Sequence, residues 1–126
     1  MRNKIIIGLH IILGLAFVVF GLNKFLGFMP SPELPPAGGA FMGAMAETGY
    51  MFPLIALTEI IAGVLILSLR LAPLGLVLLA PVSVNIVLFH LMLAPAGGLV
   101  GYVLAAINLY LLITHLPKYK PMLTGA

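Results

Sequence analysis

The sequence contains no cysteine and only six basic and three acidic residues, so 7% of its residues are charged. A soluble domain carries roughly 25% charged and 45 to 50% apolar residues, whereas 63% of this sequence is hydrophobic and its mean hydropathy is +1.25. Without cysteine the chain alone cannot perform thiol relay or disulfide exchange and cannot ligate a metal through thiolate. The scarcity of charge therefore predicts an integral membrane protein.

The basic residues do not form a nucleic-acid-binding surface. The isoelectric point is about 9.5, but lysine and arginine stand at the ends of apolar runs and form no basic stripe. This placement is typical of membrane topology. We expect membrane lipids, and not nucleic acid, as the surroundings of this chain.

Four apolar runs predict transmembrane helices, each close to the roughly 20 residues that cross a bilayer core. They cover about residues 4–26, 51–69, 72–93 and 98–116. The connectors between the last three runs are short enough to allow only antiparallel neighbours. We therefore expect one all-α domain over residues 1–126, a four-transmembrane-helix antiparallel bundle. Pro81 should kink the third span, and the tail after residue 116 should be loosely held.

A different composition marks residues 27–50, between the first and second runs. Its first half cannot be helical because prolines fix φ and lack an N–H. From Ala40 to Thr48 the spacing of apolar side chains predicts a short outer helix that is interfacial or re-entrant, with an irregular loop as the alternative. The prolines are Pro30, Pro32, Pro35 and Pro36.

Charge asymmetry predicts the orientation of the bundle. With four spans, both termini and the turn at residue 70 share one side, which carries most of the basic residues, and positive charge is enriched on the cytoplasmic side. We expect a bacterial inner-membrane protein with cytoplasmic termini and an outer segment at 27–50. The cytoplasmic group is Arg2, Lys4, Arg70, Lys118 and Lys120, and the outer group is Lys24, Glu33 and Glu47.

Glu59 is the residue that points to a function. It stands in the middle of the second apolar run, where a carboxylate costs about 2.5 to 3.5 kcal/mol on insertion scales and therefore normally faces the bundle interior. Burial favours its neutral form and a nearby cation favours its charged form, so the sequence leaves its charge state open. If the site handles protons, Glu59 is the expected carrier.

Three further polar residues are predicted to meet Glu59. A rise of 1.5 Å per residue places Lys24 about 3 Å, Asn85 about 12 Å, Glu59 about 13 Å and Asn108 about 16 Å below the outer boundary. Helical side chains lean toward the N-terminus of their helix, which brings Lys24 and Asn85 inward and the other two outward. We expect one polar layer in the outer half of the membrane.

Helical spacing supports a shared interior for most of this layer. The stripe His10, Gly14, Phe17, Gly21 and Lys24 follows one face of the first span. A similar stripe runs along the fourth span, and Glu59 shares a face with Gly63. In the third span Asn85 falls with Pro81, whereas Ser83 and His90 fall on another face. The fourth-span stripe is Gly101, Ala105, Asn108, Leu112 and His115.

Other residues complete the candidate set. His90, Tyr50 and Tyr102 are the remaining candidate ligand-binding side chains, although Tyr50 also suits an interfacial belt. The three histidines lie at different depths, so no metal site is expected, and His10 and His115 should bond across helices. The series Gly97, Gly101 and Ala105 would let another helix approach closely.

A purely structural interpretation of the layer also fits. Buried polar groups can fix the register of helices, and a Lys24–Glu59 salt bridge would add little net stability. The functional interpretation is that the layer lines a ligand cavity open to the outer side.

Three motifs carry a family resemblance that covers nearly the whole chain. FVVFGLNKF (17–25) ends the first span, GYMFPLIALTEIIAG (49–63) begins the second, and PVSVNIVLFHLMLAPAG (81–97) lies in the third. In this order, with a proline-rich outer segment, they resemble the DoxX family of small four-helix bacterial membrane proteins. Lys24, Glu59 and Asn85 fall in the matching motifs.

The resemblance implies a link to quinones. DoxX and DoxD proteins are associated with quinone-linked sulfur oxidation and with complexes that handle oxidative or thiol stress, and distant relatives are assembly factors and vitamin-K-handling enzymes. We expect an accessory protein that binds a quinone or another apolar ring or lipid, with no covalent cofactor. Any catalysis would be that of a quinone-linked oxidoreductase component. One alternative is a non-catalytic assembly or scaffold subunit of a membrane complex, such as a redox complex, which docks a partner through the glycine face of the fourth span and the outer segment. Another is a small-solute permease that works as a homo-oligomer.

Overall fold

The computed structural model describes residues 4–29, 33–95 and 98–125, and every regular element in this part of the chain is a helix. The expected all-α architecture is confirmed. Arg2, Pro30, Pro32 and Gly97, which entered the topology, the outer segment and the small-residue series, lie outside the described residues. The helices are α1 (Lys4–Leu26), α2 (Pro36–Glu47), α3 (Met51–Leu67), α4 (Ala72–Leu93), α5 (Leu99–Thr114) and α6 (Leu116–Thr124).

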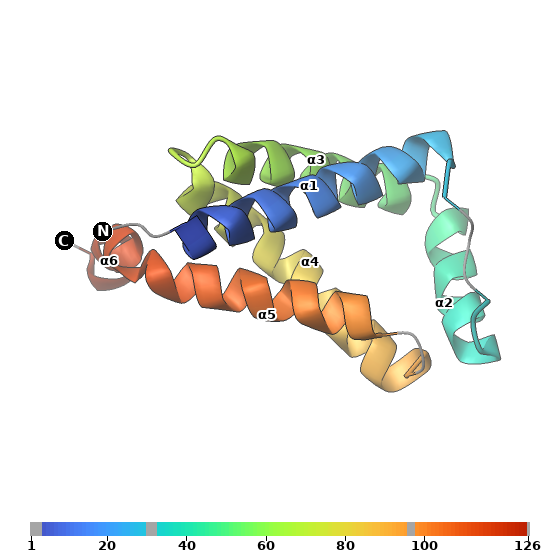
Figure 1. Ribbon diagram of the computed structural model, residues 1–126. Helices are drawn as coiled ribbons and strands as arrows, with labels where there is room; N and C mark the ends of the chain where they lie inside the picture. Colours follow the sequence, from blue (N-terminus) through green and yellow to red (C-terminus); the bar gives the residue numbers. More distant parts are fainter. Residues whose placement is uncertain (1–3, 30–32, 96–97, 126) are drawn as a thin grey trace.

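The four long helices pack in chain order. α1 lies along α3, α3 along α4, and α4 along α5, whereas α1 and α5 make far fewer contacts with each other. Figure 1 shows why: α1 and α5 approach at the end of the bundle that carries α6 and diverge toward the end where α2 lies. We call these the α6 end and the α2 end.

Glycine brings α1 and α3 into backbone contact. A Cβ built on Gly63 would lie 2.7 Å from the Gly14 carbonyl oxygen, and one on Gly21 would lie 2.8 Å from the Ala56 oxygen. Real Cβ atoms do not come this close, so only glycine permits the approach, as in small-xxx-small packing in membranes. The predicted interior stripe of α1 is confirmed for His10, Gly14, Phe17 and Gly21, which are all buried, whereas its last member, Lys24, is exposed.

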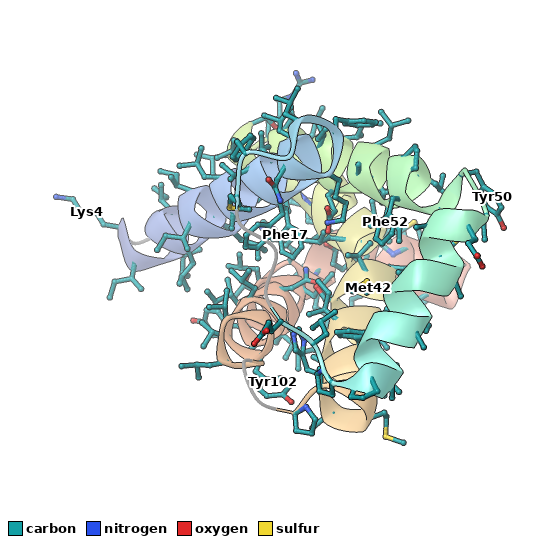
Figure 2. All side chains as sticks on the ribbon, turned by 90° about the vertical axis from the view of Figure 1, so that its right-hand side faces the viewer. Lys4, Phe17, Met42, Tyr50, Phe52 and Tyr102 are labelled. Atoms are coloured by element: carbon teal, nitrogen blue, oxygen red, sulfur yellow. The ribbon has the colours of Figure 1, made fainter. Side chains whose placement is uncertain are left out.

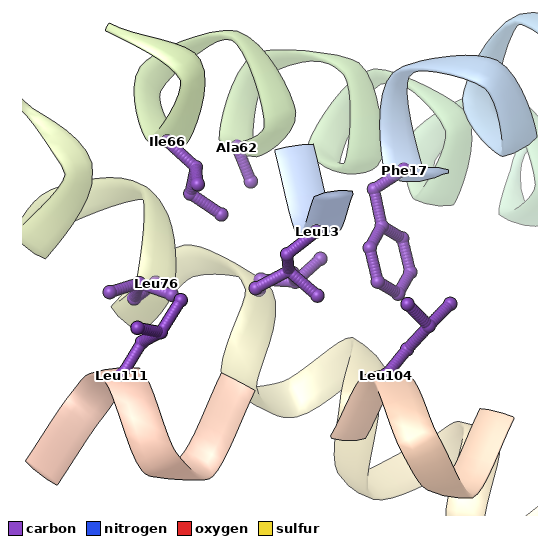
Figure 3. Packing of buried hydrophobic residues seen from close by; sticks show 8 residues of the cluster. Leu13, Phe17, Ala62, Ile66, Leu76, Leu104 and Leu111 are labelled. Carbon is purple, nitrogen blue, oxygen red and sulfur yellow. The ribbon is translucent and has the colours of Figure 1, made fainter. Parts of the chain in front are cut away.

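The hydrophobic core joins all four long helices through one cluster of side chains. Figure 3 shows Phe17 of α1 pointing toward Leu104 of α5, with Leu13 placed among residues of α3, α4 and α5. These side chains bridge the space between α1 and α5 that the backbones leave. The cluster consists of Leu13, Phe17, Ala62, Ile66, Leu76, Leu79, Leu104 and Leu111.

The outer segment forms a longer helix than the sequence predicted. α2 starts at Pro36, whose missing N–H costs nothing in a first turn, and it includes two glycines that the prediction placed before the helix. Gly38 is buried against the end of α4, where an added Cβ would lie 3.3 Å from the Leu93 oxygen. The ring of Phe41 lies 5.6 Å from that of Phe89. These contacts hold α2 against the C-terminal end of α4, and α2 makes an angle of 92° with α3.

The tail is ordered as α6, contrary to the expectation of a loosely held segment. Tyr119 is 8% exposed and its hydroxyl donates a 2.6 Å hydrogen bond to the Pro73 carbonyl at the start of α4. This burial raises the pKa of the Tyr119 phenol above its ordinary value. The buried Tyr119 therefore holds α6 in place, although the polar composition of this segment predicts a loosely held tail.

The helices are apolar enough for a membrane protein. α1 and α4 are each long and apolar enough to cross a bilayer, and counting each bent pair, α2 with α3 and α5 with α6, as one span raises the number to four. Large apolar side chains are exposed on every long helix, among them Ile12 (55%), Leu57 (51%), Leu88 (50%) and Leu109 (60%). Such surfaces suit lipid and would be a liability in water.

Candidate functional site

The centre of the site is an ion pair between α1 and α3. Lys24 Nζ donates a 2.8 Å hydrogen bond to Glu59 Oε1. Glu59 is 2% exposed, whereas the Lys24 side chain keeps 25% of its surface accessible. The predicted pairing is confirmed, including the lean of Lys24 from the end of α1 toward the middle of α3.

The local sequence explains why the two charges meet. Gly21 lies one turn before Lys24 and presses against the Ala56 backbone one turn before Glu59. The two helices are therefore so close that the lysine side chain reaches the carboxylate. Within the described residues, Glu59 Oε2 accepts no hydrogen bond, so the carboxylate keeps one oxygen able to bind a donor.

A second group of polar and aromatic side chains lies at the α2 end of α4 and α5. The His90 ring centroid is 5.3 Å from that of Phe89 and 6.1 Å from that of Tyr102. Gly98 makes room for it, since a Cβ there would lie 2.9 Å from His90 Cβ. Seen from this end, Tyr102 lies on α5 away from Phe17, and Met42 projects from α2 toward the bundle (Figure 2).

The hydrogen bond made by one ring nitrogen of His90 determines which nitrogen carries the proton. Nδ1 is 2.9 Å from the Ile86 carbonyl oxygen, which can only accept, so Nδ1 carries the proton. Neutral His90 therefore presents the lone pair of Nε2. An imidazole in this state accepts a hydrogen bond or a proton from a bound hydroxyl.

Ser83 is a buried polar residue of α4 that the candidate set omitted. The residue is 5% exposed. In the described part of the chain, its Oγ is the buried side-chain polar atom that has no hydrogen-bond partner. Buried polar groups are normally paired, so an orphan hydroxyl requires an explanation. The helical phase that places Ser83 with His90 was visible in the sequence.

The predicted four-residue layer does not form as one unit. Asn108 is buried, as expected, but its Nδ2 donates to the Leu76 carbonyl of α4 at 3.3 Å. Asn85 is exposed on the outer face of α4, where its Nδ2 donates to the Pro81 carbonyl at 2.9 Å. The prediction for Asn85 was wrong because it relied on depth in the membrane and not on helical phase. Asn85 lies about 160° around the helix from the buried Ser83.

Tyr50 also lies away from the ion pair. It precedes α3 and is 59% exposed, which matches an interfacial belt residue better than a residue that lines the interior. His90 and Tyr102 are half-buried and adjacent, whereas Tyr50 projects outward at the α2–α3 corner (Figure 2).

The other two histidines form a separate pair at the α6 end. His10 Nε2 lies 3.0 Å from His115 Nε2, and His10 Nδ1 lies 2.8 Å from the Ile6 carbonyl. Neutral His10 therefore accepts at Nε2 and His115 donates. The expected bond across helices is confirmed. No group of three metal-ligating side chains occurs within the described ranges.

A cavity of about 300 Å³ opens at the same α6 end. His115 lies on its wall, and the exposed Arg70 and Lys118 make it electropositive. Leu69 holds a left-handed backbone conformation, with φ of 62°, in the turn that forms its rim. This cavity is remote from the Lys24–Glu59 pair. Its wall is formed by Leu69, Arg70, Pro73, His115 and Lys118.

Comparison of the chain with protein-family models, with curated proteins and with solved structures finds no match.

Proposed function

We propose that this chain is a four-span membrane protein that binds an apolar ring ligand, best exemplified by a quinone. The ligand would lie between the Lys24–Glu59 pair and the face of α4 that carries Ser83 and His90. The observation that carries the proposal is the ion pair itself. A carboxylate that is 2% exposed in an apolar bundle is expensive, and such groups in membranes normally serve a ligand or proton pathway.

The chemistry of a quinone matches the groups available. A quinone ring is apolar and has two carbonyl oxygens, so it needs hydrogen-bond donors and apolar walls. Lys24, the orphan hydroxyl of Ser83 and the phenol of Tyr102 are donors. The half-buried Met42 supplies apolar surface at this end of the bundle (Figure 2).

Proton transfer has two candidate acceptors. Reduction of a quinone takes up two electrons and two protons, and oxidation of the quinol releases them. Glu59 Oε2 on α3 and His90 Nε2 on α4 are the two candidate proton acceptors. The electrons would come from a redox partner, which makes the chain an accessory component of a membrane redox system.

The sequence supports the cellular placement within the same proposal. The basic residues Arg70, Lys118 and Lys120 lie toward the α6 end, and positive charge favours the cytoplasmic side. We infer a bacterial inner-membrane protein with its termini in the cytoplasm and α2 outside. The DoxX-like motifs around Lys24 and Glu59 point to the same setting.

Quinone titration of the purified protein tests the proposal. The chain has four tyrosines and no tryptophan, so quenching of tyrosine fluorescence by a short-chain quinone reports binding. We expect saturable binding by the wild type and at least about tenfold weaker binding by Lys24→Met and Glu59→Gln. The matched controls Lys118→Met and Glu47→Gln should bind like the wild type. Equal binding by all five proteins would overturn the proposal.

Of the two docking surfaces expected for the scaffold alternative, the glycine face of the fourth span and the outer segment, the glycine face is not accessible. Gly101 is buried within the chain, where an added Cβ would lie 2.7 Å from Ile86 Cγ2. The small-residue face of α5 is therefore occupied by α4 of the same molecule.

A further inference from the structure

The exposed face of α4 has a regular pattern. Six residues follow one another at alternating intervals of four and three, and all six are exposed. This is a heptad spacing, which keeps a narrow stripe on one side of a helix. The buried residues Leu76, Leu79 and Ser83 lie on the opposite side. The stripe is Leu74, Leu78, Pro81, Asn85, Leu88 and Met92.

Asn85 is the one polar side chain in this stripe. It lies 13 residues after the start of α4 and 8 before its end, about 20 Å and about 12 Å along the helix. One N–H of its amide binds the Pro81 carbonyl. An asparagine has two N–H donors and one carbonyl acceptor. Among the described residues, the second N–H and Oδ1 have no partner and face away from the bundle.

The surroundings make this arrangement costly for a single molecule. α4 is long and apolar enough to span a bilayer, and no water is available at mid-membrane to satisfy an amide. Flanking side chains of the stripe are large and apolar, with Leu78 39%, Leu88 50% and Met92 75% exposed. Lipid can cover these, but it offers no hydrogen bond to Asn85.

We infer that the α4 stripe is the interface of a homodimer in which the Asn85 side chains of two copies hydrogen-bond each other. The amide is self-complementary, because each copy offers the donor that the other lacks and accepts in return. Two copies inserted in the same direction are related by an axis along the membrane normal. That symmetry makes their α4 helices parallel and places the two Asn85 residues at one depth.

The geometry and charge of the stripe suit a second copy. A seam with a repeat of 3.5 residues fits a left-handed helix pair crossing at about 20°. One asparagine in an otherwise apolar heptad seam fixes register and favours a defined pairing. The stripe contains no charged residue, so two identical faces do not repel each other.

Cysteine cross-linking tests the interface without background, since the chain has no cysteine. We expect Leu78→Cys and Leu88→Cys in native membranes to form disulfide-linked dimers on mild oxidation. Ile61→Cys on α3 is the matched control, because Ile61 is similarly exposed at 52% and lies near the middle of another helix. It should remain monomeric. Equal cross-linking at all three positions, or a product linked to a different protein, would overturn the inference.

Removal of the amide tests the role of Asn85 itself. In lipid, Asn85→Leu should weaken dimerisation about five- to thirtyfold, the range for polar contacts between membrane helices. Asn85→Gln, which keeps an amide, should retain part of the affinity. The thermal midpoint of the monomer in excess detergent serves as the folding control and should be unchanged. A wild type that is monomeric in lipid, or a leucine variant that dimerises equally well, would contradict the proposal.

The proposed dimer and the proposed ligand site can be tested independently of each other. Lys24→Met and Glu59→Gln lie on α1 and α3, away from the stripe, and should dimerise like the wild type. Loss of quinone binding with intact cross-linking therefore concerns the ligand alone.

Discussion

Removing the charge of Lys24 and removing that of Glu59 should lower the free energy of unfolding by different amounts. Their atoms lie 2.8 Å apart, and at an effective dielectric constant of 20 the gross attraction is about 6 kcal/mol. Desolvation offsets much of this gain, and breaking a fully buried pair costs about 3 to 5 kcal/mol. Lys24 keeps a quarter of its side chain accessible. We therefore expect a coupling free energy of about 2 to 3 kcal/mol.

The direction of the asymmetry follows from burial. Lys24→Met leaves Glu59 without its cation at 2% exposure, whereas Glu59→Gln leaves a lysine that can turn its ammonium group toward water. Lys24→Met should be the more destabilising change, and Lys24→Met combined with Glu59→Gln should recover part of the loss. The assay is a double-mutant cycle of unfolding free energies in one detergent. Single effects that add to within about 0.5 kcal/mol would show that the two charges are not coupled.

Other contacts lead to predictions at positions far from the ion pair. Gly63→Ala places a Cβ 2.7 Å from the Gly14 oxygen and should lower the unfolding free energy by about 1 to 3 kcal/mol, whereas Gly8→Ala, with nothing within 4 Å, should not lower it. Equal effects of the two alanines would argue against the α1–α3 contact. Tyr119→Phe removes a 2.6 Å hydrogen bond to the Pro73 carbonyl and should cost about 1 kcal/mol in thermal unfolding. Because the pKa of Tyr119 is raised in the folded state, its stabilising effect is present below pH 10.0 and is lost as pH rises through the raised value. Tyrosine absorbance at alkaline pH should contain one late transition that is missing in Tyr119→Phe.

The sequence predicted the long helices well because membrane spans are defined by length and hydropathy. The first span matches α1 and the third matches α4 at both ends. The other two were predicted slightly too long. The chain leaves the helical conformation after α3 at Leu69, which has a positive φ, and it bends by 71° between α5 and α6. Hydropathy alone predicts neither the end of α3 nor the bend after α5.

The site was predicted in part, for a related reason. Lys24 and Glu59 are long side chains whose reach tolerates an error of a turn, so an estimate of depth was enough to pair them. Asn85 has a short side chain, and its place depends on helical phase, which turns by 100° per residue. Ser83, two residues earlier, has the phase that faces the interior. Depth alone could not distinguish them.

α6 shows what composition misses. The segment is polar and contains Pro121 within the helix, features that favour fraying at a chain end. One hydrogen bond from Tyr119 to the start of α4 fixes it. Its acceptor lies 46 residues earlier in the chain, and a contact at that separation leaves no local signal in the sequence.

The most direct measurement of the proposed function is a native mass spectrum of the protein released gently from its membrane. We expect a peak for the chain with one bound ring ligand of quinone mass, which is absent in Lys24→Met and Glu59→Gln and retained in Glu47→Gln. A wild-type spectrum with bare chain or phospholipid alone, or the same ligand in all four proteins, would contradict it.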